Sequence, residues 1–124
     1  MKNYAILKSD VFLYGYLTHG RYYQRIMELC EKGKLTLIYN DDVLDDYKSI
    51  SYNIMNKIDD EFFTEIEKIK KHGINLNEEE IIKLTKSNNI TVYKVIPSAL
   101  SIEDKSAKAN CGFAFIELRE IEQL

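Results

Sequence analysis

Short apolar runs and longer amphipathic stretches alternate along this chain. Residues 4–7 and 35–39 are compact runs of aliphatic and aromatic residues, and residues 90–96 form a third run that ends at Pro97. Runs of this length and composition are typical of buried strands. A further strand is predicted at residues 112–116, where Gly, Phe, Ala and Ile follow one another.

Between these runs, apolar positions recur at helical spacing. Tyr23, Ile26, Met27 and Cys30 stand at i, i+3, i+4 and i+7, so they define one face of a helix that Gly33 ends. The run at residues 11–17 is less clear, since Gly is unfavourable inside a helix. Further helices are predicted at residues 41–54, 62–72, 77–87 and 101–110, with a short helix or a frayed end at residues 117–124.

Polar residues stand at two junctions between a predicted strand and the following helix. Ser9 or Asp10 suits the N-cap of the first helix, and Asn40 suits the N-cap of the third. Asp41 and Asp42 complement the positive end of that third helix. Strands that alternate with helices predict a single α/β domain over residues 1–124, with a mostly parallel central sheet of about four strands flanked by helices.

Composition adds limits on function. With 45% hydrophobic and 30% charged residues in 124, the chain has the balance of a globular domain. Its net charge of −3 gives no general attraction to nucleic acid, so contact with RNA needs a local patch. Apolar runs are too short to span a bilayer, and the two cysteines have no metal-ligand spacing. We expect a cytoplasmic protein without a membrane partner.

Three stretches resemble the PIN-domain family, especially its branch of toxins from toxin–antitoxin pairs. They are residues 6–13 (ILKSDVFL), residues 25–37 (RIMELCEKGKLTL) and residues 40–47 (NDDVLDDY). In that family a strand leads into an acidic turn, and a later helix begins with acids followed by a tyrosine. The resemblance covers about 50 residues at the amino-terminal end.

The resemblance implies a PIN-like α/β fold and a metal-dependent ribonuclease. Carboxylates of that family hold Mg²⁺ or Mn²⁺, which activates water for attack on a phosphodiester. Carried over by position, the catalytic and metal-binding residues are Asp10, Asp46 and Asp104, with Glu103 as a second choice for the last. The family's leading aspartate aligns with Lys8, and a protonated amine cannot bind a metal ion. Lys8 therefore leaves both an active and an inactive ribonuclease site open.

Two other functions stay open beside the ribonuclease. One is a catalytically inactive PIN-like module that binds a protein partner or RNA, and the other is an unrelated small α/β interaction protein. The resemblance implies RNA and a cognate antitoxin as partners, and a homodimer as the assembly. Arg21 and Tyr22 are the best candidates for stacking on RNA bases, whereas Tyr23 belongs to the predicted core.

Each acid also has a purely structural interpretation. Asp10 suits a helix cap, and Asp46 shares with Asp42 an exposed helix face that complements the helix dipole. Lys8 would then form an ion pair with Asp10 or Asp46 and occupy the place of the metal. This hypothesis predicts a structural ion pair where the family has a metal site.

Overall fold

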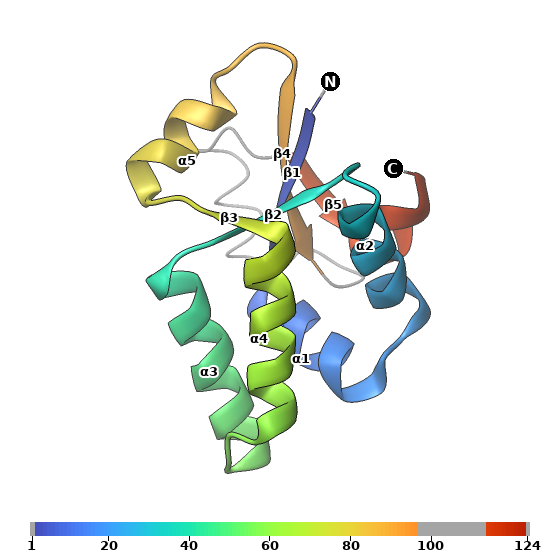
Figure 1. Ribbon diagram of the computed structural model, residues 1–124, viewed down its shortest axis with the longest axis vertical. Helices are drawn as coiled ribbons and strands as arrows, with labels where there is room; N and C mark the ends of the chain where they lie inside the picture. The colour runs from blue at the N-terminus through green and yellow to red at the C-terminus, as the bar shows by residue number, and fades with distance from the viewer. Residues whose placement is uncertain (1, 97–113, 124) are drawn as a thin grey trace.

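The protein folds around one parallel β-sheet (Figure 1). The computed structural model describes residues 2–96 and 114–123. Within them the strand order is β3-β2-β1-β4-β5, and every neighbouring pair is parallel. The strands are β1 (Lys2–Leu7), β2 (Thr36–Tyr39), β3 (Gly73–Asn75), β4 (Ile90–Ile96) and β5 (Ala114–Glu117).

Helices connect these strands, as the alternating pattern predicts. The described helices are α1 (Ser9–Thr18), α2 (Arg21–Glu31), α3 (Asp41–Met55), α4 (Asp60–His72), α5 (Glu78–Thr85) and the 3₁₀ helix η1 (Leu118–Gln123). None of them has both the length and the apolar character needed to cross a bilayer. The helix expected at residues 101–110 lies outside the described residues.

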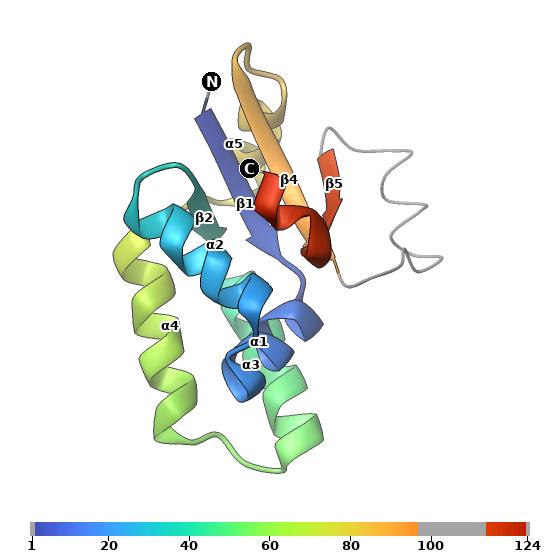
Figure 2. The same ribbon diagram turned by 90° about the vertical axis from the view of Figure 1, so that its right-hand side faces the viewer.

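The two faces of the sheet carry cores of different size. Ala5 and Leu7 of β1 point into the larger core, which α1 to α4 cover. Tyr4 and Ile6 alternate with them and join a smaller core against Ile81 of α5. Figure 2 shows α5 behind the sheet and the other helices in front of it or beyond its lower end. The predicted α/β domain with helices on both faces is therefore confirmed.

The sheet has one strand more than the sequence predicts. The missed strand is β3, whose residues Gly73, Ile74 and Asn75 pair with Leu37, Ile38 and Tyr39 of β2. It begins immediately after α4, without an intervening loop. A three-residue edge strand that contains Gly and Asn has little strand propensity of its own, so its pairing with β2 determines its conformation.

Helix ends follow the sequence at most positions. The Asn40 side chain accepts a hydrogen bond from the Val43 amide at 2.9 Å and caps α3, as predicted. Gly33 has φ of 72°, which confirms it as the left-handed residue after α2. The prediction of Ser9 or Asp10 as the N-cap of α1 was wrong. The N-cap is Lys8, which makes no side-chain capping bond, and Asp10 lies in the first turn.

Candidate functional site

Lys8 and Asp10 lie where β1 passes into α1, at the carboxyl end of the central strand. The Lys8 amide donates to the carbonyl of Val95 at 3.0 Å, so the sheet pairing continues up to the first residue of the turn. Asp10 Oδ1 accepts from the amide of Val11 at 2.8 Å. In open α/β sheets this edge is where binding sites form. Both residues therefore lie at the edge of the sheet where open α/β folds form their binding sites.

The side chains of Lys8 and Asp10 point toward one another. Lys8 Nζ lies 3.7 Å from Asp10 Oδ2, and the two side chains are 29% and 28% exposed. The ion pair predicted for Lys8 is thus present, with Asp10 as the partner. A divalent cation beside Asp10 would stand close to a positively charged amine that has no lone pair to offer. The described residues at this edge do not fit a Mg²⁺ or Mn²⁺ ion.

The other predicted ligands do not add to this pair within the described residues. Asp46 lies on α3 and is exposed, and Asp104 falls in residues 97–113, outside the described part of the chain. Across residues 2–96 and 114–123, no three His, Cys, Asp or Glu side chains converge on a common metal position. The assignment of Asp10, Asp46 and Asp104 as catalytic metal ligands stays a prediction.

Tyr47, the residue after Asp46, fixes α3 against the end of β1. Its hydroxyl donates to the carbonyl of Leu7 at 2.6 Å, and its ring stacks on Phe12 with centroids 4.4 Å apart. Burial raises the pKa of Tyr47, so the hydroxyl stays a donor. The acids at the start of α3 are therefore held at the same end of the molecule as Lys8 and Asp10.

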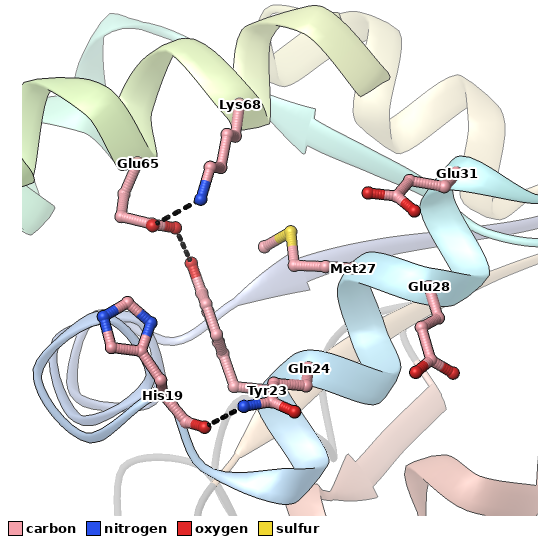
Figure 3. A pocket seen from close by; sticks show the side chains of 8 residues that line it. All are labelled: His19, Tyr23, Gln24, Met27, Glu28, Glu31, Glu65 and Lys68. Carbon is pink, nitrogen blue, oxygen red and sulfur yellow. Dashed lines mark hydrogen bonds and ion pairs between the residues drawn. The ribbon is translucent and has the colours of Figure 1, made fainter.

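A second polar site lies between α2 and α4 (Figure 3). It is an open pocket of about 190 Å³ that Tyr23, Met27 and Glu31 of α2 and Glu65 and Lys68 of α4 help to line. His19 closes one end of it from the turn between α1 and α2, and its Nε2 lies 3.0 Å from Glu61 Oε1.

Glu65 is the buried centre of this pocket, with only 2% of its surface exposed. Oε2 accepts from the Tyr23 hydroxyl and Oε1 from Lys68 Nζ, both at 3.0 Å. A buried carboxylate is costly unless such donors satisfy it. Burial, with the Glu65 carboxylate as a second cause, raises the pKa of Tyr23, which keeps the phenol protonated. The result is an ordered hydrogen-bonded group that joins two helices.

Gly15 of α1 makes room for the Tyr23 ring. A Cβ atom at residue 15 would overlap ring carbons of Tyr23, which is 3% exposed. The residue that makes α1 ambiguous in the sequence thus has a packing role. Without a side chain at this position, α1 approaches α2 closely enough for the tyrosine to reach Glu65.

Glu65 was not among the predicted site residues, although the chain carries a signal for it. Phe62, Ile66 and Ile69 form the buried face of α4, and Glu65 stands at i+3 from Phe62 on that same face. A charged residue in phase with an apolar stripe needs a buried partner.

The two candidate RNA-stacking residues lie against each other. The Arg21 guanidinium lies 5.7 Å from the centroid of the Tyr22 ring.

Comparisons with known proteins add no relative to this picture. A scan against protein-family models matched none, and searches of curated proteins and of solved structures each found no match. The fold and the geometry of the two polar sites are therefore the observations on which a function can be based.

Proposed function

We propose that this chain is a catalytically inactive PIN-like module that binds a protein partner through the carboxyl edge of its sheet. The parallel α/β fold is the kind that the resemblance of the first 50 residues implies. The ion pair between Lys8 and Asp10 carries the proposal, because it fills the position at which a metal-dependent nuclease needs an acid. A module with that substitution keeps the carboxyl edge of the sheet as a binding surface but lacks metal-dependent chemistry.

Charge at this edge favours a basic protein segment over RNA. Asp41, Asp42, Asp45 and Asp46 are exposed at the start of α3, and no described cation forms a salt bridge with them. Phosphates of RNA would be repelled by this cluster, whereas lysine and arginine side chains would be attracted. The overall charge of −3 acts in the same direction.

Metal binding tests the inactive character of the site. Titration calorimetry with Mn²⁺ and Mg²⁺ is made on the native protein, on Lys8→Asp and on the control Lys34→Asp, which alters an exposed lysine at the other end of the sheet. We expect no heat of binding from the native protein or the control, and Mn²⁺ binding by Lys8→Asp. Tight binding by the native protein, followed by RNA cleavage, would establish the ribonuclease instead. The absence of a heat of binding in all three proteins would reject the PIN-like origin of the site.

The partner class is tested with two defined probes. Fluorescence anisotropy compares a labelled ten-residue lysine peptide with a labelled ten-nucleotide uridine RNA. We expect the peptide to bind more tightly, and the double change Asp42→Asn with Asp46→Asn to weaken it several-fold. Glu78→Gln with Glu79→Gln, at the first turn of α5, removes the same charge from another helix and serves as the control. Tighter binding of the RNA would overturn the choice of partner.

A further inference from the structure

Neither Lys8 nor Asp10 lines the pocket between α2 and α4, and the pocket has no part in the proposed function. Its volume of about 190 Å³ corresponds to about six water-sized groups. Glu65 lines it as a buried acidic side chain that extends from α4 toward Tyr23 and Lys68 (Figure 3). Buried polar groups that converge on a cavity are the usual mark of a ligand site.

The Glu65 carboxylate has acceptor capacity left. Two carboxylate oxygens offer about four acceptor positions. Within the described part of the chain Glu65 uses two of them, for the hydroxyl of Tyr23 and the amine of Lys68. A ligand that reaches Glu65 with N–H groups would therefore form hydrogen bonds without displacing Tyr23.

The charges around the pocket favour a cation. Glu28 and Glu31 line it together with Glu65, while Lys68 is the one lysine or arginine among the described lining residues. Arg25 lies outside the lining and pairs with Glu28 at 3.2 Å. Glu31 has no ion-pair partner within residues 2–96 and 114–123. The lining thus carries more negative than positive charge, so it would repel an anionic ligand.

The walls of the pocket favour an alkyl chain next to that cation. Met27 projects into it from α2 and offers a flexible apolar surface, and the buried ring of Tyr23 forms another wall. We propose that the pocket binds an alkylammonium or alkylguanidinium cation of about six or seven non-hydrogen atoms, whose charged end meets Glu65.

Lys68 acts as the internal occupant of this site. Its amine lies 3.0 Å from Glu65 Oε1, yet the side chain is 54% exposed, so it can turn into solvent when another cation takes its place at the carboxylate. A ligand cation replaces this amine at the carboxylate. Removal of the Lys68 charge should therefore strengthen binding, a result that a purely structural role of Glu65 does not predict.

Propylguanidine is the probe, and its neutral isostere propylurea is the control ligand. Amide chemical shifts in ¹⁵N-labelled protein report binding and locate it. We expect propylguanidine, and not propylurea, to shift the amides of α2 and α4. Equal shifts from both ligands, or no shift at low millimolar propylguanidine, would overturn the proposal.

Variants connect the binding to the named residues. Glu65→Gln should weaken propylguanidine at least tenfold, since it removes a charge-assisted hydrogen bond. Lys68→Gln should strengthen it about fivefold. Glu67→Gln and Lys71→Gln make the same changes at exposed positions of α4 and should leave the affinity unchanged. An unaltered affinity in Lys68→Gln would contradict the role of Lys68.

A pocket-filling variant covers the case in which Glu65→Gln does not fold. Met27→Trp occupies the cavity from a partly exposed position and leaves the hydrogen bonds of Glu65 in place. We expect it to abolish the shifts, whereas retained binding would place the ligand elsewhere. The source of the cation is resolved by a second titration with acetyl-Gly-Arg-Gly-amide. Tighter binding of this peptide would assign the site to an arginine of a polypeptide, and tighter binding of propylguanidine to a free small molecule.

Discussion

Two lysine–carboxylate ion pairs in the described part of the chain have opposite surroundings. At the end of β1, Lys8 lies 3.7 Å from Asp10, and both side chains are close to 30% exposed. Between α2 and α4, Lys68 lies 3.0 Å from Glu65, whose carboxylate is nearly inaccessible and also bonded to Tyr23. The first pair lies at the junction of β1 and α1, and both residues of the second pair lie on α4.

The two pairs therefore differ in how strongly the surrounding structure constrains them. An exposed pair contributes little free energy, and water can replace either partner. A buried carboxylate must keep its donors, so the surrounding helices are constrained to supply them. The polar group between α2 and α4 is consequently the more constrained of the two, because its carboxylate is held by both Tyr23 and Lys68.

Gly15→Ala should break the buried site most severely. Alanine improves helix propensity by about 1 kcal/mol, but its Cβ overlaps the Tyr23 ring and forces the hydroxyl away from Glu65. We expect a net loss of about 3 kcal/mol in the free energy of unfolding, measured with urea. Gly20→Ala is the control, because a Cβ there meets only Thr18 Oγ1 at 3.4 Å. Similar losses in both variants would refute the packing role of Gly15.

Two tyrosine hydroxyls sharpen the comparison between the sites. Tyr23→Phe removes a donor to a buried carboxylate, and Tyr47→Phe removes a donor to the neutral carbonyl of Leu7. Hydrogen bonds to charged groups contribute more, so we expect losses of about 2 and about 1 kcal/mol respectively. Urea unfolding of both variants measures the difference. The reverse order would show that Glu65 does not depend on Tyr23.

Alkaline pH should destabilise the α2 side of the molecule. Burial, with Glu31 as a second cause, raises the pKa of Cys30 from 9.0 to about 12. The unfolded chain therefore releases this proton at lower pH than the native protein, so stability is complete below pH 9 and falls as the pH rises toward 12. Cys30 contributes a slope of up to about 1.4 kcal/mol per pH unit. Cys30→Ala should flatten the decline between pH 9 and 10, and an unchanged slope would contradict the assignment.

The smallest effect is expected at the end of β1. Lys8→Met removes the partly exposed ion pair with Asp10, and we expect this pair to contribute no more than about 0.5 kcal/mol to the free energy of unfolding. Thermal unfolding at low and high salt measures it, with Lys32→Met as an exposed control. A loss as large as that of Tyr23→Phe would mean that Lys8 stabilises the fold rather than occupies a vacant functional position.

Local sequence signals predicted the elements well where a side chain meets its own backbone. Asn77 and Glu80 form a capping box at the start of α5, and Asn40 caps α3, so both boundaries were predictable from residue types alone. The strand β3 was not, because its three residues become extended through pairing with β2. Ile54, the last residue of the predicted helix 41–54, is 60% exposed, whereas Ser51 is buried, because the packing of α3 determines which positions are covered.

The two polar sites also differ in how far local sequence signals could predict them. The positions of Lys8 and Asp10 follow from the rule that parallel strands present their carboxyl ends at one edge, and the ion pair was predicted on chemical grounds. The pocket around Glu65 requires two helices from distant parts of the chain, and its key contact joins residues 42 positions apart. Periodicity within a helix cannot indicate which partner will face a charged residue.

The direct junction of α4 and β3 at Gly73 has a mechanical consequence. A Cβ at this residue would lie 2.5 Å from the Ile69 carbonyl and 2.7 Å from that of Leu37, so helix end and sheet edge meet at one backbone position. A force that pulls β3 from the sheet is transmitted to α4 without a loop to absorb it. The edge strand and the helix that carries Glu65 should therefore exchange their amide hydrogens as one cooperative unit.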